Sequence, residues 1–312
     1  MPVTANSVPG NQSTNLAVSL MQTISYKKIE SFRQQTFRLL PRKRVKTKEE
    51  AIQFTNQRGF IFFWPIKDIV LPSLWQAVAG DRPVADQHDD PGHVTWGWKD
   101  SLLGAHRWYY AKVLRKRATI ISLEVLPYFY ALSENYGSPE EDYLTIYEQG
   151  RLTREAKLVY EALLREGPLD TVTLRRVTHL TSKDSEYRFN RALIELQTDF
   201  KILPVGVTEA GAWHYAFAYD LVPRHFPGLL DQTRFIQESQ ARQKLLELYF
   251  KSVGAAQLTD LSKLFRWRPP DLQGTLNRMI QSGFLGSGLE IDGEPGEWLA
   301  LRVLLESRSQ PG

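Results

Sequence analysis

Basic side chains gather in two short segments of this 312-residue sequence. Pro41 to Lys48 reads PRKRVKTK, and Arg107 to Arg117 carries five cations with no acid among them. The formal net charge is only +4, so the clustering is more informative than the total. Clustered positive charge favours a polyanion such as DNA, although a solvated charged face has the same composition. The candidate DNA contacts in the second segment are Arg107, Lys112, Arg115, Lys116 and Arg117.

Acidic and aromatic side chains offer two other kinds of chemistry. The stretch DQHDDPGH places carboxylates beside His88 and His93, which are ligand types for a hard metal ion. Their spacing matches no metal signature, so we expect a solvated loop without a metal. Aromatic side chains between positions 63 and 110 can frame a pocket for a flipped base, or they can form a Trp-rich core. The candidates for a base pocket are Phe63, Trp64, Trp96 and Trp98.

Composition narrows the class of protein. The chain has no cysteine, which excludes disulfides and thiolate chemistry and fits a reducing cytosol. No apolar run approaches the roughly 20 residues needed to cross a bilayer. Neither GxxxxGK[ST] nor GxGxxG occurs, so we expect no nucleotide cofactor. The composition therefore predicts a cytoplasmic protein, without a membrane partner or cofactor, and we expect a monomer.

An internal repeat organises the C-terminal half. Residues 167–180 align without a gap on residues 254–267, a shift of 87 positions that places Leu174 on Leu261. At the same shift, Asn190-Arg191 meets Asn277-Arg278. A repeat of this length suits a small domain rather than a solenoid unit.

Each copy predicts three helices followed by a β-hairpin. The first copy has helices near 153–165, 171–180 and 185–197 and strands near 201–207 and 212–220. The second has helices near 234–252, 258–265 and 270–282 and a hairpin within 284–304. This order is that of a winged helix, so we predict a mainly α fold with small β-hairpins (α+β) and tandem winged-helix domains at 151–228 and 229–308.

The third helix of a winged helix is free to enter a major groove, and its Arg and Asn side chains can reach phosphates and base edges. The candidates on or beside the two third helices are Arg188, Arg191, Arg266, Arg268, Asn277 and Arg278. Other winged helices bind proteins or their own neighbours, and Glu186 and Glu195 weaken the DNA interpretation for the first copy.

The N-terminal half is less regular. Residues 1–24 are polar and are predicted to be disordered, and residues 25–150 to form a helical domain. Helices are expected near 26–40, 47–57, 73–79, 124–135 and 140–148, with a long loop from Ala79 to Trp98. Arg107 to Leu123 predicts a hairpin with a basic tip, which is either a probe of DNA or an edge protected by charge.

In order and spacing, five segments make the chain similar to the bacterial AlkZ/YcaQ family of winged-helix DNA glycosylases, and to its AlkZ-related members. The segments are WGWKDSLL (96–103), VYEALLREGPLDTVTLRR (159–176), FNRALIEL…KILPVG (189–206), WHYAFAYDLVPRHFP (213–227) and ARQKLLELY (241–249). The resemblance implies a helix-rich fold over roughly 27–304, a double-stranded DNA partner and a role in DNA repair. The family excises alkylated purines and unhooks interstrand crosslinks.

The resemblance also implies where catalysis would occur. The family's Gln-x-Asp or Gln-x-Gln motif, which positions water for attack on the sugar, follows a helix and a Gly-Phe-like turn. Here that place follows Arg58-Gly59-Phe60 and reads Ile61-Phe-Phe-Trp-Pro65, which contains no Gln, Asp or Glu. Phe and Trp can stack on a base but cannot activate water. Carboxylates elsewhere that can take over this role are Asp86, Asp89, Asp90, Asp100 and Glu124.

Three functions remain open from the sequence. The first is a repair protein that recognises damaged or distorted duplex DNA, with a relocated catalytic carboxylate if it is a glycosylase. The second is a non-enzymatic DNA binder, such as a regulator or damage sensor, that has lost the motif. The third is an adaptor that uses winged helices to bind other proteins.

Overall fold

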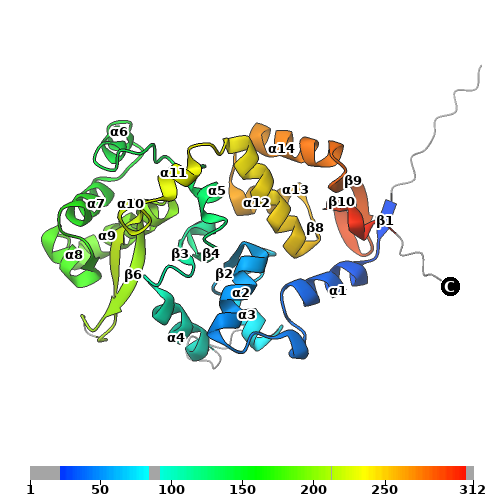
Figure 1. Cartoon of the computed structure of the whole chain (residues 1–312), viewed down its shortest axis with the longest axis horizontal. Helices are drawn as coiled ribbons and strands as arrows, with labels where there is room; N and C mark the ends of the chain where they lie inside the picture. Colours follow the sequence, from blue (N-terminus) through cyan, green and yellow to red (C-terminus); the bar gives the residue numbers. More distant parts are fainter. Residues whose placement is uncertain (1–21, 84–91, 212, 307–312) are drawn as a thin grey trace, which may run out of the picture.

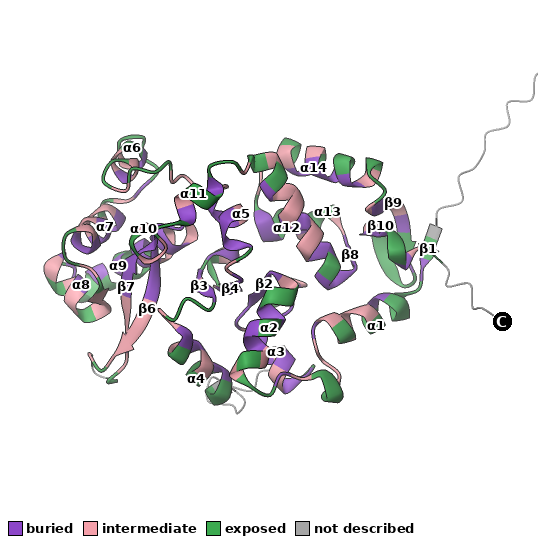
Figure 2. Cartoon of the chain, viewed as in Figure 1, coloured by how far each residue is buried: buried purple, intermediate pink, exposed green. Residues whose placement is uncertain are grey.

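A computed structural model describes residues 22–83, 92–211 and 213–306. Figure 1 shows a body with its long axis horizontal, in which a small central sheet lies between two helical ends. One end consists of residues from the middle of the chain. The other brings the C-terminal residues beside the start of the described chain. Buried residues follow the inward faces of the helices in Figure 2.

The N-terminal half surrounds a three-stranded sheet. Its strand order is β2-β4-β3, all antiparallel, with Phe60 and Tyr109 both opposite Ile121. The elements are α1 (Tyr26–Thr36), η1 (Pro41–Lys43), α2 (Lys48–Arg58), β2 (Phe60–Phe62), α3 (Leu74–Ala79), α4 (Gly92–Leu102), β3 (Tyr109–Lys112), η2 (Leu114–Lys116), β4 (Ala118–Ile121), α5 (Leu126–Tyr130) and α6 (Asp142–Glu148). The Thr47 hydroxyl caps α2 by accepting a hydrogen bond from the Glu50 amide at 3.2 Å.

The first repeat unit has the element order expected from its sequence. It contains α7 (Arg154–Glu166), β5 (Leu169–Asp170), α8 (Thr171–Val177), α9 (Lys183–Thr198), β6 (Ile202–Thr208) and β7 (Ala216–Leu221), with the sheet order β5-β7-β6. Asp170 caps α8 by accepting hydrogen bonds from the Val172 and Thr173 amides. Two short helices, α10 (Val222–His225) and α11 (Leu229–Thr233), lead to the second unit.

The second unit repeats this arrangement. It contains α12 (Glu238–Val253), β8 (Ala255–Ala256), α13 (Leu258–Phe265), α14 (Pro269–Gln281), β9 (Leu285–Ile291), β10 (Glu294–Leu301) and η3 (Arg302–Leu304). Strands β8, β10 and β9 lie in the same order as β5, β7 and β6. The 87-residue repeat in the sequence thus corresponds to a repeat of secondary structure and sheet order.

Strand β1 (Gln22–Ile24) adds a parallel fourth strand to this sheet, beside β9. These three residues belong to the segment predicted to be disordered, so the expected disorder does not extend to them. Ile24 is buried at 4% exposure against the second unit. Burying an apolar side chain in a hydrophobic core releases enough free energy to order a short strand whose other residues are polar.

The cores divide the chain differently from the predicted domains. The first unit has a core of its own, which includes Val159, Leu174 and Phe189. The second unit shares one core with the N-terminal half, where Phe60 and Tyr109 belong to the same cluster as Leu245, and Phe200 and Leu203 of the first unit reach this cluster too. The segments predicted as separate domains at 25–150 and 229–308 therefore pack as one body.

The prediction of a loop from Ala79 to Trp98 is wrong at its C-terminal end, because residues 92–102 form helix α4. Its buried positions are Thr95, Lys99 and Leu102, at helical spacing. Two of these three residues are polar, so the sequence gives no apolar periodicity. Packing against α3 and β6 stabilises this helix, rather than the composition of the segment.

Candidate nucleic-acid interface

The predicted basic hairpin is present, and its tip is fixed by the rest of the protein. Arg115 and Lys116 both have left-handed backbones, with φ of 56° and 58°, which form the tight turn between β3 and β4. Leu114 is buried beneath them, and Arg115 Nη1 donates a 2.9 Å hydrogen bond to the carbonyl of Lys263 at the α13 helix. The tip also contacts α9. The hairpin therefore joins the two repeat units, and Arg115 is a structural anchor.

Beside this hairpin lies a cavity of about 610 Å³, which we call the basic cavity. Its cations are Lys67, Lys112, Lys116 and Arg117, and its other lining residues are Trp64, Pro65, Ile66, Ala118 and Ile194. Among the described residues, no carboxylate lines this cavity. Desolvation, followed by the positive charge of Arg117, lowers the pKa of Lys112. An anion in this cavity would relieve that repulsion.

Trp64 is held in the wall of the basic cavity by other aromatic rings. It stacks on Trp75 with centroids 6.1 Å apart and meets Phe63 edge-on at 5.5 Å. Its side chain is half-buried, so part of the ring faces the cavity. Phe63 is 1% exposed and lies in the core. Of the four predicted base-pocket residues, the structure places only Trp64 beside the predicted DNA-binding cations.

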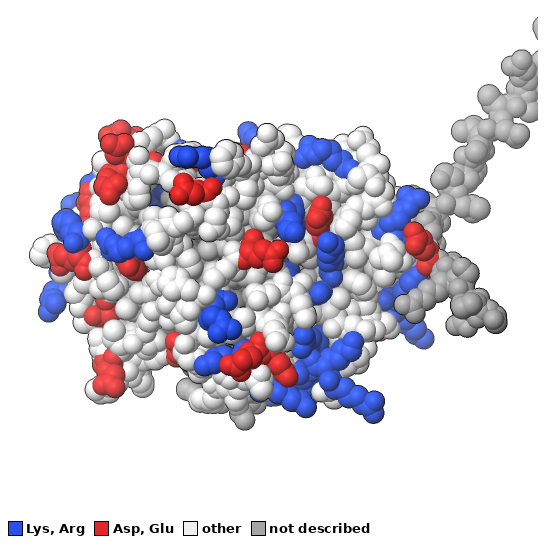
Figure 3. Space-filling view, in the orientation of Figure 1, with Lys and Arg blue, Asp and Glu red and all other residues white. Residues whose placement is uncertain are grey.

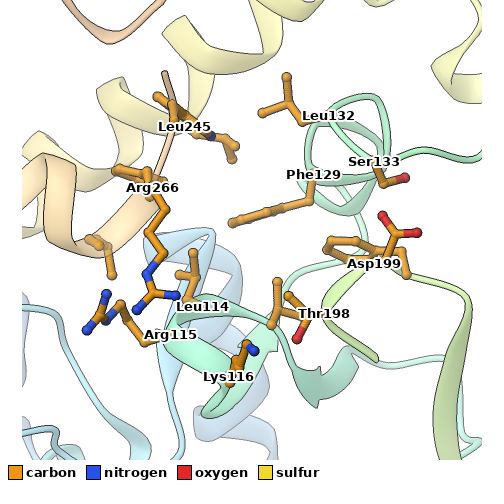
Figure 4. A pocket seen from close by; sticks show the side chains of 15 residues that line it. Leu114, Arg115, Lys116, Phe129, Leu132, Ser133, Thr198, Asp199, Leu245 and Arg266 are labelled. Atoms are coloured by element: carbon orange, nitrogen blue, oxygen red, sulfur yellow. The ribbon is translucent and has the colours of Figure 1, made fainter. Parts of the chain in front are cut away.

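On the other side of the hairpin tip is a smaller hollow of about 230 Å³, the junction cavity, shown in Figure 4. The Arg115 and Arg266 side chains extend into the same part of it, and Asp199 lies opposite them. Burial raises the pKa of Asp199, although its 2.9 Å ion pair with Lys201 opposes this. Phe129, Leu132 and Leu245 give the rest of the wall an apolar character.

Helix α9 presents an exposed face that leads to both cavities. Arg191 is exposed, and Ile194, one turn later, lines the basic cavity. Thr198, at the end of the helix, lines the junction cavity. Tyr187, one turn before Arg191, is 74% exposed, and sequence analysis missed it. Arg188 is exposed too, but it pairs with Glu155 at 3.1 Å.

The candidates of the second unit are more dispersed. Arg268 is exposed but pairs with Asp271 at 2.7 Å. Asn277 and Arg278 are exposed on α14, where Asn277 accepts from Gln273 and Arg278 donates to Thr275. The hairpin β9–β10 carries exposed acids at Glu290, Asp292, Glu294 and Glu297, and it carries no Lys or Arg. That charge opposes contact between this hairpin and a phosphate backbone.

Lys99 and Asp100 form a buried cluster that joins α4 to the first unit. Lys99 is 1% exposed, and its ammonium lies 2.7 Å from Asp100 Oδ1 and 2.9 Å from the Tyr215 hydroxyl oxygen. The Tyr215 hydroxyl donates to Asp100 Oδ1 at 3.0 Å, and the Trp96 indole N–H donates to the Tyr215 oxygen at 3.2 Å. Burial lowers the pKa of Lys99, and Asp100 partly offsets this.

Aromatic rings enclose the Lys99 ammonium. Its Nζ lies 4.3 Å from the ring centroid of Trp96 and 4.5 Å from that of Phe217. Phe63, Tyr110 and Tyr215 are within 6.0 Å. The predicted residue Trp96 thus contacts a lysine of the protein itself.

The other predicted residues lie apart from the basic cavity. Trp98 is half-buried and packs against the core cluster that contains Phe54 and Leu74. Arg107 is exposed at the end of β3 opposite the turn, and Glu124 is exposed after β4. Asp86, Asp89 and Asp90 lie outside the described residues. Sequence analysis missed Lys67, Lys99 and Tyr215, because no local pattern links them to the hairpin. Within the described ranges, no three His, Cys, Asp or Glu side chains form a metal-binding group.

Comparison with known proteins identifies the class. The AlkZ-related family matches residues 45–266, and the chain belongs to this family. The fold is similar to that of the DNA glycosylase AlkZ from Streptomyces sahachiroi, with a TM-score of 0.55, 12% sequence identity, and coverage of 89% of this chain and 70% of that one. No curated protein matches. In the part of the chain that the structure describes, no helix has the length and apolar character to span a bilayer.

Proposed function

We propose that this protein binds double-stranded DNA and recognises damaged or distorted sites. The observation that carries the proposal is the basic cavity. It combines four cations with a half-buried tryptophan shortly after β2. The resemblance to the family implies that its catalytic motif would stand at this place in the chain. Cations hold the phosphate backbone, and an aromatic ring offers a stacking surface for an unpaired base.

Helix α9 is the DNA-facing helix in this proposal. Its exposed face runs through Arg191 toward the basic cavity, so a duplex held by that face also meets the hairpin cations. The acidic β9–β10 hairpin disfavours an equivalent role for the second unit. We propose that both repeat units are winged helices, which fits their shared element order.

We further propose that recognition does not lead to base excision by the family's usual mechanism. Ile61, Phe62 and Phe63 are buried and apolar, so they cannot orient a water molecule. Asp100 lies on α4 with Trp96 and Trp98, but its Oδ1 already contacts Lys99 and accepts from Tyr215. The alternative, excision by a relocated carboxylate, requires that Asp86, Asp89, Asp90, Asp100 or Glu124 be essential for turnover.

Fluorescence anisotropy tests the proposal with an intact duplex and a duplex carrying a stable abasic-site analogue, over a salt series. We expect tighter binding of the abasic duplex. Lys112→Ala/Arg117→Ala should reduce the salt slope by about 2 units, at about 0.9 for each lost phosphate contact, and Trp64→Leu should reduce the abasic preference without changing the slope. Arg165→Ala/Arg234→Ala, which removes two exposed cations that do not line the cavity, is the control.

Each result has a defined meaning. Absence of binding to either duplex refutes the proposal and favours the adaptor function. Equal affinity for both duplexes, with a normal salt slope, leaves plain DNA binding and refutes damage recognition. Excision by a relocated carboxylate is established if the wild type releases a base from alkylated DNA and replacing one of the five candidate carboxylates by its amide abolishes the release.

A further inference from the structure

A second strongly basic hollow lies at the corner between α1 and α2. Its volume is about 430 Å³, and we call it the corner cavity. Figure 3 shows blue side chains gathered over this corner. The lining residues are Gln35, Arg38, Arg42, Lys43, Arg44, Lys46, Glu50 and Gln57, none of which lines the basic cavity. Four of the five cations of the PRKRVKTK segment therefore line this cavity.

The charge of this cavity is not neutralised. Five cations face one carboxylate, and within the described residues none of the five forms an ion pair. Exposed cations elsewhere, such as Arg151, Arg188 and Arg268, do have acidic partners. The single acid, Glu50, accepts a 2.7 Å bond from the Lys46 amide and so contributes to the fold around α2. Burial, followed by the charge of Arg38, lowers the pKa of the neighbouring Arg58.

Several of the cations are held in position. Arg38 has a left-handed backbone, with φ of 60°, and its Nη2 donates to Gln57 at 3.0 Å. Lys43 Nζ donates to Gln35 at 3.1 Å. Arg44 packs over Gly80, where a Cβ atom would lie 2.3 Å from Nη2, so a side chain at this position would displace the guanidinium. Arg44 Nε is buried and has no protein acceptor in the described structure. Positioned donors lose less entropy when they bind an anion.

We propose that the corner cavity binds phosphate groups of the DNA backbone, away from the site of base recognition. Arginine matches the geometry of phosphate oxygens, and a hollow of this size holds more than one phosphate contact. The inference rests on the proposed DNA binding and adds a second contact region to it. Because the two cavities share no residue, this region sets affinity without affecting the preference for damaged DNA.

The test is the triple variant Arg42→Ala/Lys43→Ala/Lys46→Ala, whose three side chains are exposed. Against the same two duplexes, its salt slope should fall by about 2 to 3 units, at about 0.9 for each phosphate contact. The ratio of abasic to intact affinity should stay at the wild-type value. The charge-matched control Arg165→Ala/Arg234→Ala/Arg302→Ala removes three exposed cations that line neither cavity and should leave the slope unchanged. Thermal unfolding of both variants verifies the fold.

An unchanged slope in the triple variant, while the wild type binds DNA, overturns this inference and leaves the proposed function standing. Inorganic pyrophosphate is a second probe of the site. If it raises the melting temperature of the wild type and not of the variant while the slope is unchanged, the cavity binds a small anion and not the DNA backbone, and the inference is still overturned. An equal loss of slope in the control overturns the inference too, because only overall charge would matter. If the wild type binds neither duplex, the proposed function is refuted, and the inference that rests on it is refuted as well.

Discussion

Replacing Asp100 by Asn tests whether this carboxylate is structural. Lys99 is 1% exposed, and Asp100 supplies the anion at 2.7 Å. Removing one partner of a buried ion pair costs about 3 to 5 kcal/mol, because the other charge remains buried without compensation. Asp100 is 24% exposed, and the Tyr215 hydroxyl and the aromatic rings still contact the ammonium. We therefore expect Asp100→Asn to lower the free energy of unfolding by about 2 to 3 kcal/mol.

The companion variants separate charge from packing. Lys99→Met keeps an apolar chain inside the aromatic rings and removes the buried charge, so its stability should stay within about 1 kcal/mol of the wild type. Lys99→Met/Asp100→Asn should be more stable than Asp100→Asn alone, because no cation is left unpaired. Urea unfolding followed by tryptophan fluorescence measures all three. The reasoning is refuted if Asp100→Asn is as stable as the wild type, or if the double variant is the least stable.

Three further predictions concern the hairpin tip and a histidine pair. Arg115→Ala should destabilise the protein by about 1 kcal/mol in chemical unfolding, because the bond to Lys263 is lost; an unchanged value would mean that the tip is not anchored. Lys116→Gly should raise the free energy of unfolding by about 1 kcal/mol, because glycine adopts the left-handed backbone of this turn without steric strain. The same variant should weaken DNA binding. A lower free energy of unfolding would show that the lysine backbone is not strained here. Burial, followed by the charge of the nearby His106, lowers the pKa of His225 below 6.5. The protein should therefore lose stability as the pH decreases from 6.5 to the folded-state pKa, because the unfolded chain binds the proton more readily. His225→Gln should flatten this pH dependence of the melting temperature, and an unaltered profile would assign it to other groups.

The repeat units are the part of the fold that the sequence predicted best. Helices α7, α9, α12, α13 and α14 carry apolar residues at helical spacing, and this local pattern survives in the folded protein. Strands β3 and β4 were found because apolar and basic residues alternate around the turn at Arg115 and Lys116. Boundaries moved by a few residues, as with α5, which spans five residues of a predicted 12-residue helix.

The candidate site was predictable only in parts. Lys112, Lys116 and Arg117 were recognised as a basic cluster, and Trp64 as an aromatic candidate, from their types alone. That these side chains line one cavity depends on β2 pairing with β4, which brings residues some 50 positions apart together. Lys67 joins them for the same reason, and it has no local signal.

Sequence by itself determined the repeat, the basic hairpin, the absence of Gln, Asp and Glu between Ile61 and Pro65, and the family resemblance, because each is a property of neighbouring residues or of their order. Tertiary structure alone decided that Arg115 is anchored to Lys263. It also decided that α4 is a helix whose Lys99 is enclosed by aromatic rings from four different parts of the chain. Burial and ion pairing depend on which distant segments meet, and only the packed fold brings those segments together.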